Sequence, residues 1–93
     1  MTRIERTTQF KRDYKRELKG RHRKDLSTLL LEVLEVLANN QQLEIKYKDH
    51  ALTGEWSDYR DCHIKPDLIL IYRNPAVDVL QLVRLGSHSQ LGI

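Results

Sequence analysis

The sequence has little cysteine and no long apolar run. Its single cysteine, Cys62, cannot form an internal disulfide or, by itself, a thiolate metal site, which agrees with a reducing compartment. The longest purely apolar run, LILIY, is far shorter than the roughly 20 residues that cross a bilayer. The N-terminal stretch MTRIERTTQFKRDYKRELKG is charged throughout and lacks the apolar core of a secretory signal. We therefore expect a cytoplasmic protein that does not contact membranes.

Several motifs of well-known enzyme classes are also missing. The chain has no phosphate-cradling glycine loop, no nucleophile elbow and no dinucleotide fingerprint, which argues against phosphoryl-transfer and redox enzymes of those types. Three histidines and an aspartate are enough in number for a zinc site. However, the spacing of His50, His63 and His88 matches no short ligand motif such as H-E-x-x-H. We expect neither a metal nor another cofactor.

The size and composition indicate one globular domain over residues 1–93. Hydrophobic residues make up 40% of the 93 residues and charged residues 31%. Residues 1–24 carry ten Lys or Arg against three acidic residues, a net charge of +7, whereas the other 69 residues carry −4. Such a basic segment is suited to phosphates or to an acidic protein partner, and it is also typical of a solvated helix face.

Hydrophobic spacing predicts a strand followed by two helices. The alternating stretch TRIERT is expected to be an edge strand with Ile4 as its main inward residue. Thr7 or Thr8 can cap a helix whose apolar residues recur every four positions, and Gly20 is expected to end it. A second helix is predicted over residues 23–39, where leucines and a valine keep the spacing of one buried stripe. These helices should form an antiparallel pair.

The second half of the chain predicts the rest of a sheet. DYRDCHI, LILIYR and VLQLVRL are expected strands, separated by the turns KPD and NPAVD. The expected fold is therefore α+β, in the order β-α-α-β-β-β, with two N-terminal helices packed on one face of a mainly antiparallel sheet. Strand alternation would turn Cys62 and Ile64 toward the helices and Asp61 and His63 toward the open face.

Polar residues that suit acid–base chemistry lie at the ends of these strands. They are His50, His63, Asp67 and His88, and His63 and Asp67 flank a tight turn, so they can be neighbours across the hairpin. In metal-free RNA cleavage, a base takes the ribose 2′-OH proton, an acid protonates the 5′-oxygen, and cations offset the phosphorane charge. Histidine can perform either proton transfer near neutral pH. Trp56 and Tyr59 also fit a purely structural role as core or sheet cover.

The motifs taken together resemble a known family. The combination KDHxLxGxW, YRDxHxxPDxxLIY and RxGxHxxL, in this order, is similar to the RelE/ParE superfamily of bacterial type II toxins, and most closely to its YafQ subgroup of ribosome-dependent mRNA interferases. The resemblance implies a RelE-like compact domain that cleaves mRNA in the ribosomal A site without a metal. Its functional residues fall on His50, His63, Asp67 and His88.

The resemblance also implies supporting residues and partners. His50 or Asp67 would be the base, His88 the acid or base, and His63 would position the phosphate. Asp61 would orient a neighbour and Arg84 would stabilise the phosphorane. Basic residues would contact ribosomal RNA, namely Lys11, Arg12, Lys15, Arg16 and Lys48.

The partner that the resemblance implies is a cognate antitoxin of the DinJ/RelB type, with DNA bound only through the complex. One departure is Gly92, which stands where relatives commonly have a base-stacking aromatic. The protein would then bind its codon more weakly or use Trp56, Tyr59 or Tyr47 instead, with Ile93 as a partial replacement. A ParE-like gyrase inhibitor and a non-catalytic nucleic-acid-binding module remain alternatives to the nuclease.

Overall fold

The structure, a computed structural model, describes residues 2–93 and contains one five-stranded sheet. The elements are β1 (Arg3–Arg6), α1 (Thr8–Leu18), α2 (Leu26–Ala38), η1 (Ile45–Tyr47), β2 (His50–Ala51), η2 (Gly54–Trp56), β3 (Arg60–Lys65), β4 (Leu68–Ala76), β5 (Val79–Gly86) and α3 (His88–Leu91).

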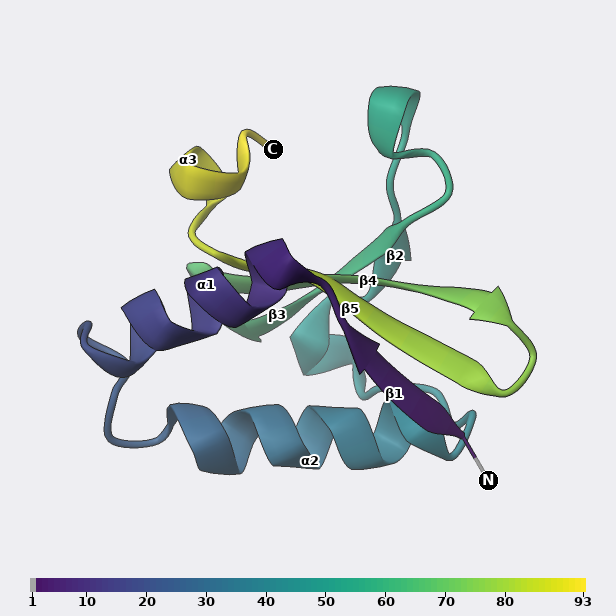
Figure 1. Cartoon of the computed structure of the whole chain (residues 1–93), viewed down its shortest axis with the longest axis horizontal. Helices are drawn as coiled ribbons and strands as arrows, with labels where there is room; N and C mark the ends of the chain where they lie inside the picture. The colour runs from purple at the N-terminus through teal and green to yellow at the C-terminus, as the bar shows by residue number, and fades with distance from the viewer. Residues whose placement is uncertain (1) are drawn as a thin grey trace.

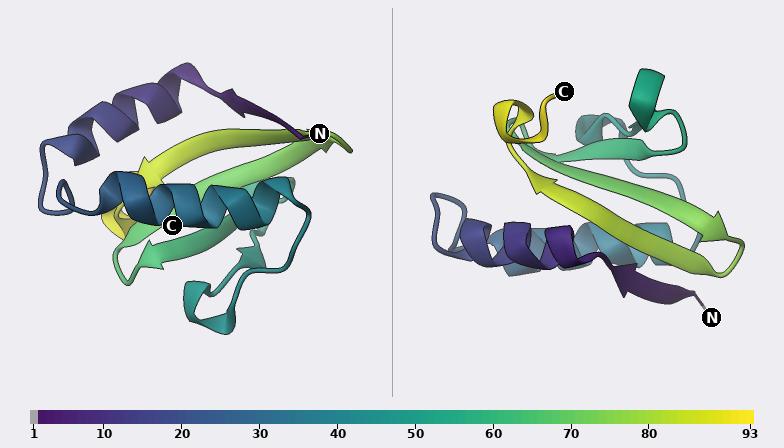
Figure 2. Two further views of the ribbon diagram at one scale, coloured as in Figure 1. Left: turned by 90° about the horizontal axis from the view of Figure 1, so that it is seen from below. Right: turned by 45° about the horizontal axis from the view of Figure 1, so that its top comes forward.

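The strand order is β1-β5-β4-β3-β2, and neighbouring strands are antiparallel except for the parallel pair β1 and β5. Helices α1 and α2 lie on one face of the sheet, while η2 and α3 lie on the other (Figures 1 and 2). The expected α+β fold is confirmed.

The two long helices follow the predicted spacing. The Thr7 hydroxyl caps α1 by accepting the Phe10 amide at 3.0 Å, which satisfies one of the unpaired donors of the first turn. Helix α2 begins at Leu26, three residues later than predicted, because residues 21–25 form turns rather than helix. None of the helices among residues 2–93 is long and apolar enough to span a membrane.

Strand β4 is longer than predicted. It continues through Pro75 to Ala76, so only the last part of NPAVD forms the turn to β5. Proline lacks the amide that a regular ladder requires. It is accommodated here because the register between β4 and β5 shifts between Arg73 and Ala76.

The main core fills the space between α1, α2 and the sheet. Cys62 is fully buried in it, as predicted. Ile4 is less buried than the prediction of an inward residue implies, since it is 42% exposed. Its strand β1 is the outermost of the sheet, and the Ile4 side chain lines a groove of about 360 Å³ together with Phe10 and Leu31.

The opposite face of the sheet is less open than predicted. Ile69 and Ile71 of β4 are fully buried there, in a second apolar cluster closed by Leu91 of α3 and by Trp56 and other residues of the 52–59 segment. The prediction missed this cover because neither η2 nor the four-residue α3 shows a periodic pattern. A histidine-bearing surface remains beside this cluster, at the ends of β2, β3 and β5.

Candidate active site

Strand register places the predicted site residues in two adjacent rows across the sheet. In the first row, His50 of β2 pairs with Asp61 of β3, which pairs with Ile71 of β4, which pairs with Arg84 of β5. In the second row, His63 pairs with Ile69, which pairs with Gly86. The chain then returns over this row at α3, which carries His88. The sheet and α3 therefore bring His50, His63 and His88, which are far apart in the sequence, onto one surface.

The loop before β2 fixes the orientation of His50. Asp49 anchors this loop by accepting hydrogen bonds from the Tyr72 hydroxyl at 2.7 Å and from Arg60 Nε at 3.3 Å. The Nδ1 atom of His50 lies 2.8 Å from the Lys48 carbonyl oxygen. Because a carbonyl can only accept, Nδ1 must carry the proton. The Nε2 atom of neutral His50 is then left with a lone pair, as a base requires.

His88 is held by Asp67. The Oδ1 atom of Asp67 accepts from His88 Nδ1 at 2.9 Å and from the His88 amide at 3.1 Å, while Oδ2 pairs with Arg21 at 3.2 Å. The hydrogen bonds from His88 hold the pKa of Asp67 below its ordinary value. Asp67 therefore orients His88. The turn that carries Asp67 directs its carboxylate toward α3.

A capping box positions the helix that carries His88. Ser87 accepts from the Gln90 amide at 3.2 Å, and the Gln90 side chain accepts from the Ser87 amide at 2.8 Å. Gly86 precedes this box in a crowded place, since a Cβ there would lie 2.8 Å from Arg16 Nη2 and 2.9 Å from Gln90 Oε1. A side chain at this position would displace the ends of the Arg16 and Gln90 side chains, which hydrogen-bond Asp13 and Ser87.

His63 is the central member of the histidine cluster. Its ring centroid lies 6.5 Å from that of His50 and 5.2 Å from that of His88. Three imidazoles from β2, β3 and α3 thus share one surface. His50 and His88 each have Nδ1 occupied by an acceptor, so each has Nε2 left to exchange a proton.

Asp61 lies directly beneath this cluster and is only 3% exposed. Burial raises the pKa of its carboxyl group, although the charges of His50 and His63 act in the opposite direction. Its Oδ1 atom lies 3.1 Å from His50 Nδ1, but the geometry there does not form a hydrogen bond, and Oδ1 has no other partner among residues 2–93. An ionised Asp61 therefore costs folding energy and interacts favourably with protonated histidines.

We predict opposite effects of Asp61→Asn on stability and on cleavage. Because the pKa of Asp61 is higher in the folded protein than its ordinary value of 3.8, ionisation of Asp61 lowers the free energy of unfolding as the pH rises from 3.8 through the folded pKa. Asparagine does not ionise, so the free energy of unfolding of the variant at pH 7 should equal or exceed that of the wild type. Cleavage should fall roughly 10- to 100-fold because His50 loses its charged neighbour. Urea unfolding at pH 7 and a cleavage assay measure both effects, and a destabilised variant would contradict the prediction.

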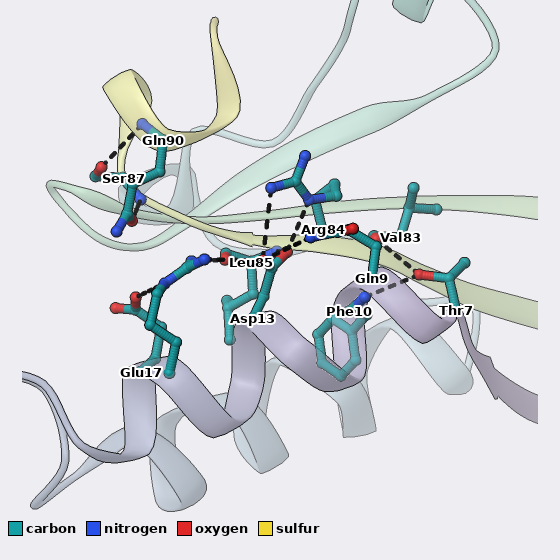
Figure 3. A network of polar contacts seen from close by, with 11 residues as sticks. Thr7, Gln9, Phe10, Asp13, Glu17, Val83, Arg84, Leu85, Ser87 and Gln90 are labelled. Atoms are coloured by element: carbon teal, nitrogen blue, oxygen red, sulfur yellow. Dashed lines mark hydrogen bonds and ion pairs between the residues drawn. The ribbon is translucent and has the colours of Figure 1, made fainter.

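A buried carboxylate that the sequence analysis missed joins α1 to this region (Figure 3). Asp13 is fully buried and accepts from Arg84 Nε at 2.8 Å, from the Leu85 amide at 3.0 Å and from Arg16 Nη1 at 3.0 Å. Burial raises its pKa, but these bonds and the two arginine charges outweigh burial and hold the pKa below its ordinary value. The available signal was its position three residues after Phe10, on the apolar side of α1.

The contacts of Asp13 engage two arginines, Arg84 and Arg16, that were predicted to interact with RNA. Arg84 lies on the histidine-bearing face by register, and its Nε and Nη2 are turned toward Asp13. All three guanidinium nitrogens of Arg16 are engaged within the fold, with Asp13, Glu17 and the Leu85 carbonyl. Lys11, Arg12, Lys15 and Lys48 are exposed. Arg16 therefore differs from the other basic residues predicted to contact RNA in that its guanidinium group is already hydrogen-bonded within the fold.

The two aromatic residues of the 52–59 segment cover the sheet. Trp56 and Tyr59 pack edge to face, with ring centroids 5.2 Å apart, against the buried Ile69 and Ile71. Within residues 2–93, no group of three or more His, Cys, Asp or Glu side chains is arranged to hold a metal ion.

Fold and site together define a class of protein: a small α+β domain that presents a cluster of oriented histidines and aspartates on one face of its sheet. The family described as "Bacterial toxin of type II toxin-antitoxin system, YafQ" matches residues 2–92. The chain therefore belongs to the YafQ family of bacterial toxins.

Individual relatives agree with this assignment. The mRNA interferase toxin YafQ of Escherichia coli (strain K12) is 38% identical over 88 residues, covering 95% of this chain and 92% of the relative. A metal-bound toxin from Helicobacter pylori superposes with a TM-score of 0.86 at 47% identity, over 98% of this chain and 99% of that one. The toxin of the E. coli DinJ-YafQ complex gives a TM-score of 0.82 at 39% identity, over 98% of both chains.

Proposed function

We propose that this protein is a ribosome-dependent mRNA interferase, an endoribonuclease that inhibits translation as the toxin of a type II toxin-antitoxin pair. The observation that carries the proposal is the histidine cluster, in which His50 and His88 each have Nδ1 fixed and flank the third ring, His63. Relatives that are named mRNA interferases support it. The reaction requires one base and one acid beside a phosphate, and the cluster contains both.

The chemistry assigned to the cluster is transphosphorylation. His50 Nε2 takes the proton of a ribose 2′-OH, and the oxygen attacks the adjacent phosphorus. The bond from phosphorus to the 5′-oxygen breaks, and protonated His88 Nε2 gives its proton to that leaving oxygen. The products are a 2′,3′-cyclic phosphate and a free 5′-hydroxyl. His63 lies between the two proton carriers, where it can bind the phosphate oxygens, and Arg84 adds positive charge on the same face.

Asp67 is the less suitable base of the two that the sequence left open. Both of its carboxylate oxygens are engaged, one with His88 and the other with Arg21. We assign Asp67 the task of orienting His88 and assign proton abstraction to His50, whose Nε2 makes no hydrogen bond to residues 2–93.

Exposed basic residues are proposed to contact the ribosome and its mRNA in the cytoplasm. Lys11, Arg12 and Lys15 lie on α1, and Lys48 lies beside His50. Such contacts with phosphates weaken as salt rises. Arg16 contributes mainly to the fold because its guanidinium is engaged. The protein partner is proposed to be an antitoxin of the DinJ type, as in the E. coli complex. It would carry an acidic segment that matches the basic residues 1–24, and DNA would be bound only by the complex.

Primer extension on an mRNA translated in a reconstituted system tests the proposal. We expect in-frame cuts that require ribosomes, with no comparable cutting of the same mRNA when free. Absence of cuts in both conditions would contradict the nuclease. Inhibition of supercoiling by gyrase, without cleavage, would instead favour the ParE-like alternative, and salt-sensitive RNA binding without strand scission would favour a binding module.

A further inference from the structure

A cleft directly adjoins the histidine cluster. Its volume is about 490 Å³, and it lies between η1, the first turns of α2 and the end of β3. His63 and His88 form part of its wall, so it is continuous with the site of proton transfer. Clefts of roughly 300–1,000 Å³ are typical of bound small molecules or their parts. The cleft exists because β2 pairs with β3 only at Arg60 and Asp61, which leaves the rest of that strand edge beside η1.

The walls of this cleft combine an aromatic ring with positive charge. Tyr47 is half-buried, and one side of it packs on the main core. The Nζ atom of the exposed Lys46 lies 5.1 Å from the Tyr47 ring centroid. Lys48 also lines the cleft. A nucleobase can take the place of the flexible Lys46 over the ring, and Lys46 and Lys48 can then pair with the flanking phosphates.

The other two candidate aromatics are poorly placed for this task. Trp56 and Tyr59 pack on one another and on the apolar cluster of β4, and the guanidinium of Arg73 lies 5.3 Å from the Tyr59 ring centroid. Neither residue lines the cleft beside His63. Of the three aromatics that can compensate for Gly92, only Tyr47 lies in the wall shared with the histidines.

Glu32 provides a group that can distinguish bases. It is an exposed residue of α2 on the wall of the cleft, and its carboxylate makes no hydrogen bond or ion pair with residues 2–93. A carboxylate only accepts hydrogen bonds, so it favours a base with an exocyclic amine, as in adenine, cytosine or guanine. Uracil presents carbonyl oxygens in place of such an amine.

We propose that this cleft binds the nucleotide next to the scissile phosphate, with Tyr47 stacking on its base, Lys46 and Lys48 pairing with phosphate, and Glu32 selecting a base that carries an amine. The inference rests on the proposed function, since it assigns a subsite of the same nuclease. Tyr47 thereby takes the role of the base-stacking aromatic residue that relatives commonly have at the position of Gly92.

Primer extension in the reconstituted translation system tests the subsite with four variants. Tyr47→Ala should lower cleavage by roughly 5- to 150-fold, the effect of one lost stacking contact, while Tyr47→Phe keeps the ring and should restore most of the cleavage that Tyr47→Ala loses. Glu32→Gln adds a donor and should increase cuts beside uracil relative to cuts beside adenine, cytosine or guanine. Its matched control, Glu35→Gln, changes an exposed residue of α2 outside the cleft and should leave the profile unchanged.

The outcomes separate the subsite from the nuclease. If the wild type makes no ribosome-dependent cuts, the proposed function itself fails. If the wild type cuts and the Tyr47 and Glu32 variants match it in rate and sequence profile, only the subsite is wrong. Loss of cleavage in Tyr47→Phe as well would show that the hydroxyl matters and would overturn stacking. Should Tyr47→Ala fail to fold by circular dichroism, the Glu32→Gln profile still decides whether the cleft reads a base.

Discussion

His88→Ala is expected to lower ribosome-dependent cleavage by roughly 10²–10⁴-fold, the typical contribution of one proton transfer. His88 is the residue whose Nδ1 is held by Asp67 at 2.9 Å, which leaves Nε2 to protonate the 5′-oxygen. Without it, the leaving group must take a proton from water. The measurement is the fraction of mRNA cut against time, at equal concentrations of folded protein.

A second histidine provides the control for this experiment. His22 lies in the basic turn between α1 and α2, outside the histidine cluster. His22→Ala should therefore cleave like the wild type. Because the His88 side chain is 48% exposed, its removal should leave the circular-dichroism spectrum unchanged. Wild-type cleavage by a folded His88→Ala would refute the assigned role.

Asp13→Asn is expected to have the largest effect on stability, lowering the free energy of unfolding at pH 7 by about 2–3 kcal/mol. The substitution keeps the shape of the side chain but removes the charge that Arg84 and Arg16 share. The estimate lies below that of a fully buried ion pair because the Arg16 side chain is 40% exposed and remains partly hydrated. Urea denaturation of both proteins measures the difference.

This difference should depend on pH in a defined direction. The folded pKa of Asp13 is lowered from an ordinary value of 3.8, so its stabilising contribution is complete well above that value. As the pH falls below 3.8, the unfolded chain binds the proton first, and the contribution is lost as the pH passes through the lowered folded pKa. The wild type and Asp13→Asn should therefore become more alike as the pH is lowered from 6 toward 3.

Asp25→Asn is the matched control for Asp13. Asp25 pairs with Lys65 at 2.8 Å, but this pair lies at the surface, where solvent screens it. Its removal should change stability far less than the removal of Asp13. Equal effects of the two substitutions, or a difference between wild type and Asp13→Asn that does not narrow on acidification, would contradict the structural role of the buried carboxylate.

Much of the fold was predictable because it depends on local periodicity. The spacing from Phe10 to Leu18 predicted α1, and the alternation of Cys62 and His63 predicted which face of β3 each occupies. The short elements were missed, since two to four residues carry no period. Pro75 was taken as part of a turn because its placement in β4 depends on a register shift that involves β5.

The site was predictable in its residues but not in its contacts. The motifs selected His50, His63, Asp67 and His88, and the structure brings the three histidines together. The hydrogen bond of Asp67 to His88, 21 positions away in the chain, was not predictable, because it depends on how α3 folds back over the sheet.

By itself, the sequence determined the secondary structure, the family and the residue types available for chemistry, because these depend on spacing and on side-chain identity. Only the tertiary structure decided that Asp13 is buried, that Arg16 is engaged within the fold, and that Tyr47 stands beside His63. The reason is physical. Whether a charged group is hydrogen-bonded and whether an aromatic ring is accessible depend on burial and on residues distant in the chain. Only folding brings those residues into contact.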